Sequence, residues 1–280
     1  MRSSPALRLM TVLSMLAVPS GSAFAQRYWF DDQGRDAVHL DALYPFLKGS
    51  TDRFITGVFL PSASFRIGEG FRLEGDLPMM RAGYHPPTGP NTSNFRIGNP
   101  YVGLRIGDEQ KLVTGLVGVR VALGRTPQNP AGALAVAAGS LAYPEDFEAF
   151  TPPLLTIRGG VELRRLRKDG LLLGLRGGSS LLINTGGNPT DETNLYFDYG
   201  ARIGYEGPRA QATVALTGRY LINPNFPQNF DERSRHSATG TVELRPGKVR
   251  PRATLKIPFD KELRDASGAT LGVGVSIAHK

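Results

Sequence analysis

Apolar and polar side chains alternate with a period of two along most of the chain after residue 54. In 71–77 (FRLEGDL), Phe71 and Leu73 share one face of a strand, and Arg72 and Glu74 share the other. The same alternation recurs in 155–163, 171–184, 195–205, 210–222, 237–245, 252–260 and 271–277, and less cleanly in 95–107 and 111–123. Because side chains of a strand alternate between its two faces, the pattern predicts an all-β fold whose strands each have one apolar and one polar face.

Two architectures fit such strands. A soluble sandwich or barrel buries the apolar face, whereas a transmembrane barrel turns it toward lipid and turns the polar face toward the lumen. Short turns are expected at 68–70, 108–110, 168–169, 207–208 and 247–249, and longer connections at 86–93, 125–152, 185–193, 223–235 and 263–268. Regular alternation of short and long connections is typical of outer-membrane barrels, so the sequence predicts a closed antiparallel transmembrane β-barrel with short periplasmic turns and longer extracellular loops.

The strand count follows from parity. Eleven strands begin at or after residue 54, and the first of these descends into a short turn, so an earlier rising strand is needed. The segment 37–47 (AVHLDALYPFL) is the candidate, although Leu43 and Leu47 lie on its other face and Pro45 interrupts it. Twelve strands leave no edge unpaired in lipid. Ten strands remain an alternative if 37–53 is a plug or a tail.

The N-terminus has the pattern of a secretory signal. Arg2 and Arg8 precede the apolar stretch 9–18, and the small residues Ala23 and Ala25 lie just before Gln26. We therefore predict a signal peptide over 1–25 and a single barrel domain over 26–280, located in the bacterial outer membrane. The apolar stretch is shorter than the roughly 20 residues of a membrane-spanning helix.

Composition narrows the classes further. The chain has no cysteine, which excludes disulfides and thiolate metal sites. Its net charge of +8 falls to +6 without Arg2 and Arg8, and the remaining arginines are spread along the chain. A dispersed positive charge argues against a nucleic-acid partner. The alanine-rich run 131–142 is too short to cross a bilayer as a helix.

The runs FITGVFLPSASFRIGEGFRLEGDLPMMRA (54–82) and NFRIGNPYVGLRIG (94–107), with the closing strand 255–278, resemble porin-like bacterial outer-membrane barrels. Among such barrels, these runs resemble the transporters of the meta-pathway phenol-degradation type. The resemblance implies passage of small, often aromatic or apolar, solutes. It also implies two partners, outer-membrane lipid and the outer-membrane assembly machinery. Such barrels usually close on an aromatic residue, whereas this chain ends Ala278-His279-Lys280.

The sequence offers no convincing enzyme site. His236 and Ser237 are the only adjacent histidine and serine, but neighbouring residues of a strand point to opposite faces. Asp31, Asp32 and Asp36 lack the spacing of a calcium loop. We therefore predict no catalytic residue, no metal site and no cofactor.

The polar faces supply the candidate functional residues. The alternation predicts that the lumen is lined by Arg66, Arg72, Glu74, Asp76, Arg105, Arg120, Arg158, Glu162, Arg176, Asp198, Arg202, Arg219, Glu243, Arg245, Arg252 and Lys256. These groups either pair across strands and fill the interior, or leave a surplus of cations that attracts anionic solutes. The long connection 125–152 is a candidate constriction loop, which would bring Glu145, Asp146 and Glu148 opposite wall arginines. An ordinary surface loop is the alternative.

Three functions follow from these features. The first is a channel or transporter-like barrel for passive passage of small solutes with a weak anion preference. The second is a closed barrel with a structural or surface-binding role and no conductance. The third is a soluble periplasmic β-domain that binds an apolar ligand.

Overall fold

The computed structural model describes residues 36–48, 56–86, 88–107, 112–167, 170–186, 193–223 and 230–278. The signal peptide predicted over 1–25, Asp31 and Asp32 lie outside these ranges. The strands are β1 (Ala37–Leu47), β2 (Gly57–Gly68), β3 (Phe71–Asp76), β4 (Met79–Tyr84), β5 (Thr92–Ile97), β6 (Tyr101–Ile106), β7 (Val113–Arg120), β8 (Leu154–Leu166), β9 (Leu171–Asn184), β10 (Thr193–Glu206), β11 (Ala210–Leu221), β12 (Ser234–Leu244), β13 (Val249–Pro258) and β14 (Ser267–Ala278).

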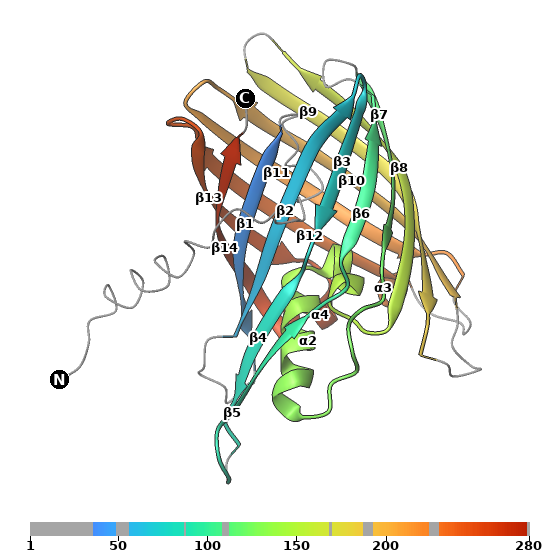
Figure 1. Ribbon diagram of the computed structural model, residues 1–280, viewed down its shortest axis with the longest axis vertical. Helices are drawn as coiled ribbons and strands as arrows, with labels where there is room; N and C mark the ends of the chain where they lie inside the picture. Colours follow the sequence, from blue (N-terminus) through green and yellow to red (C-terminus); the bar gives the residue numbers. More distant parts are fainter. Residues whose placement is uncertain are drawn as a thin grey trace, which may run out of the picture.

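These strands form one closed antiparallel sheet. Each strand from β7 to β13 pairs with the strand before it and the strand after it in sequence. The pairing of β1 with both β14 and β2 closes the ring. Strands β3 and β4 are two halves of one barrel strand, as are β5 and β6, so the barrel has twelve strands (Figure 1). The twelve-stranded prediction is confirmed, and the segment 37–47 forms the first strand.

The two interruptions lie side by side in the sheet. Asp76 pairs with Tyr101, and Met79 pairs with Ile97, so residues 98–100 oppose the shorter stretch 77–78. This extra residue is a β-bulge, which bends the strand and breaks its pairing. The segment 95–107, expected as one strand, is therefore divided into the end of β5 and all of β6.

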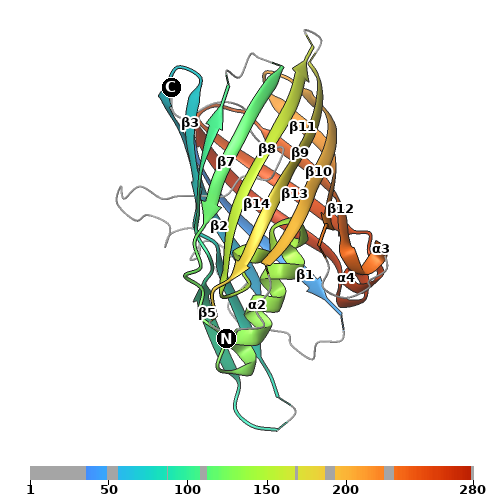
Figure 2. The same ribbon diagram turned by 90° about the vertical axis from the view of Figure 1, so that its right-hand side faces the viewer.

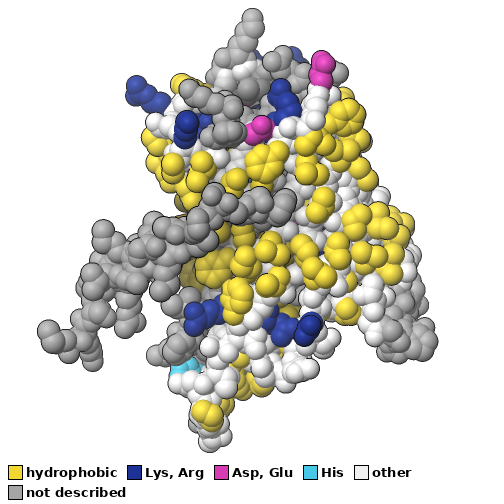
Figure 3. Space-filling view, viewed as in Figure 1, with side chains coloured by type: hydrophobic (Ala, Val, Ile, Leu, Met, Phe, Trp, Pro, Cys, Tyr) yellow, Lys and Arg dark blue, Asp and Glu magenta, His cyan; other side chains and the backbone are white. Residues whose placement is uncertain are grey.

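The faces of the strands are arranged as a membrane barrel requires. Val273 is 66% exposed, and Ile203, Leu175 and Val214 are also exposed on the outer surface. Their polar neighbours, such as Arg202 and Arg176, are buried inside. Figure 3 shows apolar side chains covering the waist of the molecule, with lysines and arginines above and below them. The predicted inversion, with apolar side chains outside and charged ones inside, is confirmed.

The two ends of the barrel differ. Short turns such as 69–70 and 207–209 lie at one end, which also holds the first residue of β1 and the last of β14 (Figure 1). The other end holds α2 (Pro130–Ala142), the 3-10 helix η1 (Pro144–Ala149), α3 (Phe230–Arg233) and α4 (Lys261–Ala266). Because outer-membrane barrels have short periplasmic turns, the end with the helices is assigned as extracellular. Among the helices in the described ranges, none has the length and hydropathy needed to cross a membrane.

One part of the inner surface is apolar, which the alternation did not predict. Leu43 of β1, Val58 and Leu60 of β2, and Met80 of β4 point inward and are almost fully buried. The helix α2 packs against this patch and lies along β4 and β5 near the extracellular end (Figure 2). The helix is rich in alanine because its close approach to the wall leaves room only for small side chains. Leu43 thus faces inward, against the alternation of 37–47, because it belongs to the apolar patch that α2 covers.

Candidate functional site

The predicted lumen residues lie at alternate positions of the strands and turn inward. All of them are buried or nearly so except Glu74 and Arg245, which are half-buried, and Arg66. The Arg66 side chain is exposed at the periplasmic end of β2, where its backbone N–H donates to Asp36. The remaining residues form the wall of the site described below.

The connection between β7 and β8 enters the barrel and meets this wall. The helix α2 contacts β1, β2, β4 and β5, whereas η1 contacts β8, β11 and β12 on the opposite side. The chain therefore crosses the lumen between α2 and η1. We call Pro144–Ala149 the crossing segment; it contains Glu145, Asp146 and Glu148.

Asp146 and Glu148 are bound by three arginines of the wall. Asp146 accepts from Arg120 (Nη2–Oδ2 2.8 Å) and from Arg158 (Nη2–Oδ1 2.6 Å). Glu148 accepts from Arg158 (Nη2–Oε1 2.7 Å) and from Arg219 (Nη1–Oε2 2.6 Å). Arg158 thus bridges the two carboxylates, and the side chains of Asp146 and Glu148 have no solvent exposure.

Wall carboxylates hold two of these arginines in place. Arg120 donates to both carboxylate oxygens of Asp76, at 2.7 and 3.0 Å. Arg219 donates through Nε to Asp198 at 2.7 Å, and Asp198 also accepts from Ser180. This second set of contacts fixes the guanidinium planes, so the wall presents an organised set of donors to the crossing segment.

Aromatic rings complete the contact. The guanidinium of Arg235 lies 4.2 Å from the centre of the Phe147 ring, and Arg219 lies 5.5 Å from it. Tyr196 meets Phe147 edge to face at 6.1 Å. Lys256 binds Glu145 and lies 3.9 Å from the Tyr143 ring. Cation–π contacts of this kind strengthen when water is excluded.

A second ion-pair network fills the periplasmic part of the lumen. Arg105 binds Glu74 at 2.7 Å and Glu162 at 2.9 Å, and Arg202 also binds Glu162, at 3.2 Å. Arg176 of β9 interacts electrostatically with Glu162 from the same wall. Further pairs join Arg164 and Arg245 to Glu206, Arg245 to Glu243, Arg252 to Asp41, and Arg72 to Asp36. The lumen is therefore occupied by paired charges at both levels.

Asn99 anchors the loop to the barrel. It lies in the bulge between β5 and β6 and has no solvent exposure. Its amide nitrogen donates to the carbonyls of Glu148 (2.8 Å), Thr151 (3.0 Å) and Leu154 (3.3 Å), and its amide oxygen accepts from the Gly124 N–H at 2.7 Å. Gly98 allows this approach, because a Cβ there would lie 2.2 Å from the Ala149 carbonyl oxygen. One side chain thus holds both ends of the connection.

The charge state of the crossing segment follows from its neighbours. Burial acts to raise the pKa of the Asp146 carboxyl, but the charges of Arg120 and Arg158 outweigh burial and hold that pKa well below its usual value. Asp146 is therefore ionised at neutral pH and attracts the wall.

Sequence reasoning did not single out Asn99, Arg235, Tyr196 or Phe147. The irregular Gly98-Asn99-Pro100 in an otherwise alternating segment was the available signal for the anchor. No comparable signal marks Phe147, since its contacts depend on where the loop folds.

His236 and Ser237 lie on opposite faces of β12, as expected. Ser237 is buried and hydrogen-bonds to Thr217 inside the barrel. His236 lies between the Tyr199 hydroxyl (2.6 Å) and Asp260 (Nδ1–Oδ1 2.9 Å). No group of three or more metal-binding side chains occurs within the described ranges.

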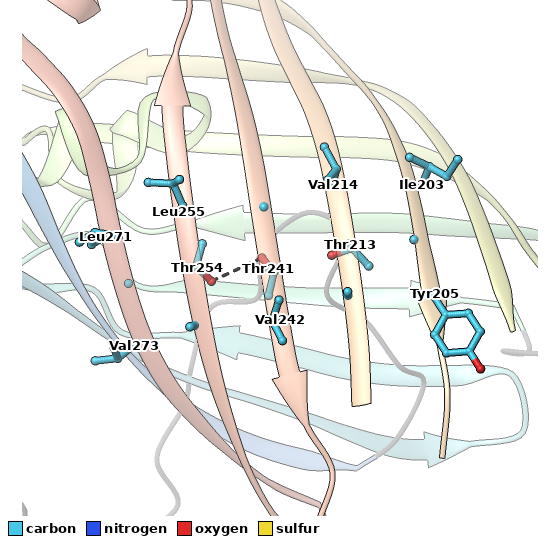
Figure 4. A pocket seen from close by; sticks show the side chains of 15 residues that line it. Ile203, Tyr205, Thr213, Val214, Thr241, Val242, Thr254, Leu255, Leu271 and Val273 are labelled. Atoms are coloured by element: carbon cyan, nitrogen blue, oxygen red, sulfur yellow. Dashed lines mark hydrogen bonds between the residues drawn. The ribbon is translucent and has the colours of Figure 1, made fainter. Parts of the chain in front are cut away.

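An apolar hollow of about 760 Å³ lies on the outer surface across β10 to β14 (Figure 4). Glycines and alanines line it together with larger side chains, among them Ile203, Tyr205, Val242, Leu271 and Val273. It belongs to the apolar exterior of the barrel and is separate from the lumen.

No family model matches the chain. No curated protein matches it either.

Solved structures do match. The chain is similar to the COG4313 outer membrane channel from Pseudomonas putida F1, with 10% identity over 94% of this chain and 100% of that one, at a TM-score of 0.61. It is also similar to the translocator domain of the autotransporter NalP from Neisseria meningitidis (14% identity, 97% and 93% covered, TM-score 0.54). The NanC porin matches with 9% identity, 87% and 100% covered, and a TM-score of 0.52. At these identities the likeness is one of fold, and the chain has the fold of bacterial outer-membrane β-barrels such as porins and channels.

Proposed function

We propose that this protein is an outer-membrane channel or transporter-like barrel for the passive passage of small solutes, with a weak preference for anions. The observation that carries the proposal is the row of inward arginines and a lysine on the wall, met inside the lumen by the crossing segment. Cationic side chains that line a pore lower the entry barrier for anions.

The crossing segment is the proposed constriction. Its carboxylates Glu145, Asp146 and Glu148 bind the wall cations, so the segment obstructs the lumen at this level. Passage of a solute requires that the segment shift away from Arg158 and Arg219. Buried ion pairs are costly to separate in a dry interior, but water that enters the lumen solvates both partners and reduces that cost.

Conductance in planar bilayers tests the proposal. The purified chain should give discrete conductance steps, and Arg176→Glu or Arg120→Glu should shift ion selectivity toward cations. Arg264→Glu is the matched control, because Arg264 lies on α4 outside the barrel wall and the same charge reversal there should leave selectivity unchanged. Absence of conductance, or equal selectivity in all variants, would contradict the proposal.

A closed barrel with a structural or surface-binding role is the second candidate. It is favoured by the burial of the ion pairs, since the side chains of Arg219 and Glu148 are both inaccessible to solvent. This candidate predicts heat-modifiable migration on gels without conductance. A soluble periplasmic domain does not fit the exposed apolar belt.

Three further assignments stay predictions. They are the specific resemblance to transporters of the meta-pathway phenol-degradation type, insertion by the outer-membrane assembly machinery, and the absence of enzymatic activity. Export by a signal peptide over 1–25 is likewise a prediction, which N-terminal sequencing of the membrane-inserted protein tests.

A further inference from the structure

The wall at the level of the crossing segment presents four cationic side chains to it. Arg120, Arg158, Arg219 and Lys256 belong to the wall, and the wall carboxylates that bind them in the described contacts are Asp76 and Asp198. The loop carboxylates Glu145, Asp146 and Glu148 bind the same four cations. The crossing segment therefore occupies a site that wall cations line.

The geometry of this site favours a ligand that carries more than one carboxylate. Arg158 contacts Asp146 and Glu148 through the same nitrogen, at 2.6 and 2.7 Å. Arg120 binds the other carboxylate oxygen of Asp146, and Arg219 binds the other carboxylate oxygen of Glu148. Two anionic groups held on a short organic backbone, as in residues 146–148, match the three guanidinium groups together, whereas a single carboxylate matches only part of them.

The site also accommodates an organic body between the charges. Phe147 lies against Arg235 and Tyr196 on the wall side. A bare inorganic ion makes no such contact. Polar and aromatic groups therefore surround the position that the backbone and ring of the segment now occupy.

We infer that the cationic site binds a small organic di- or tricarboxylate, which takes the place of the crossing segment. The inference rests on the proposed function, because the solute reaches the site through the lumen. Removal of the segment would take from Arg120, Arg158 and Arg219 the carboxylates of Asp146 and Glu148, and a soluble polycarboxylate restores those buried ion pairs. The segment acts as a tethered competitor of the solute.

Isothermal titration calorimetry of the detergent-purified full chain tests the inference without any need for conductance. Citrate is the probe, and acetate and sulfate are compared with it at equal ionic strength and neutral pH. Glu148→Gln weakens the tethered competitor, so the association constant for citrate should rise about tenfold. Arg158→Gln should abolish citrate binding. Asp265→Asn, an exposed change on α4, should leave it unchanged.

Equal citrate affinity in the wild type and Glu148→Gln, or acetate or sulfate binding as tightly as citrate, would overturn the inference. Heat-modifiable migration verifies that each variant is folded, and Glu148→Gln decides alone if Arg158→Gln does not fold. A barrel that conducts but binds no citrate refutes the site and leaves the channel. A barrel that binds citrate but never conducts supports the site and refutes the channel.

Discussion

At the scale of single residues, Asn99 and Arg158 organise the interior. Asn99 satisfies three loop carbonyls and one loop N–H from a fully buried position, and Arg158 joins two loop carboxylates. A buried polar group whose partner is removed costs more than the hydrogen bond contributes. Individual side chains therefore determine whether the connection between β7 and β8 stays inside the barrel.

Asn99→Ala should release this connection. The change removes the Asn99 donor from the Glu148 carbonyl and the acceptor of the Gly124 N–H, at a cost of about 1–3 kcal/mol for each buried group that stays unsatisfied. Hydrogen exchange of amides in 121–153 should accelerate, while exchange in β9 to β11 should not. Asn94→Ala is the control, since Asn94 is half-exposed and makes one long contact with Asn129. Unchanged exchange in Asn99→Ala would show that the anchor is dispensable.

The contribution of Asp146 to loop attachment should be insensitive to pH above the acid range. The pKa of Asp146 is lowered below its ordinary value of 3.8, so its stabilising contribution is complete above that value and is lost only as the pH falls through the lowered pKa. Asp146→Asn should therefore increase cleavage of 121–153 by proteinase K, relative to the wild type at the same pH, by the same factor at about pH 8 and about pH 5. An increase at about pH 8 that disappears at about pH 5 would contradict an Asp146 that stays ionised.

At the scale of elements, α2 and the crossing segment belong to one unit that packs on both walls. The helix covers the apolar patch of β1, β2 and β4, and its C-terminal end leads through Tyr143 into the ion pairs with β7, β8, β11 and β13. Gly139 is part of this packing, because a Cβ there would lie 2.4 Å from the Phe150 ring. Space for a side chain is absent at that point.

Gly139→Ala should loosen the unit. Overpacking of a close contact costs about 1–3 kcal/mol, and the displaced Phe150 adjoins the residues bound by Asn99. Proteinase K should cleave 121–153 faster than in the wild type. Ala133→Leu, a larger change on the exposed face of α2, is the control and should have no effect. Equal cleavage in all three proteins would show that α2 does not hold the segment.

The sequence predicts the elements of the barrel well and the loop only in part. Alternation in 155–163 and 195–205 specifies which side chains face lipid, because lipid and lumen impose opposite polarity on successive residues. The alternation did not predict that the apolar side chains of Val58, Leu60 and Met80 face inward, since this depends on their packing against a helix distant in sequence. The partners of Glu148 could not be predicted from the sequence either, because Arg158 and Arg219 bind it only after the loop has folded.

At the scale of the whole molecule, the barrel has an apolar exterior and a charged interior, closed by pairing of β1 with β14. This is the arrangement of a transmembrane β-barrel. The hollow across β10 to β14 and the belt around it form part of the apolar exterior.

Val273→Arg should destabilise the membrane-inserted barrel. Val273 is 66% exposed near the middle of β14, and an arginine at the midplane of the lipid face costs about 2–4 kcal/mol. Leu244→Arg, at the periplasmic end of β12, should cost about 0–1 kcal/mol. Denaturant titrations in lipid vesicles measure both. Equal, small effects would contradict the placement of this face in lipid.

The most direct test of the account compares single-channel conductance of the intact chain with that of a variant in which 130–149 is replaced by a short Gly-Ser linker. The replacement removes α2 and the crossing segment but leaves the twelve strands. The account predicts small or infrequent conductance steps for the intact chain, and steps several-fold larger for the variant, because the lumen is freed. Identical conductance in the two proteins, or no conductance in either, would contradict a channel restricted by its own loop.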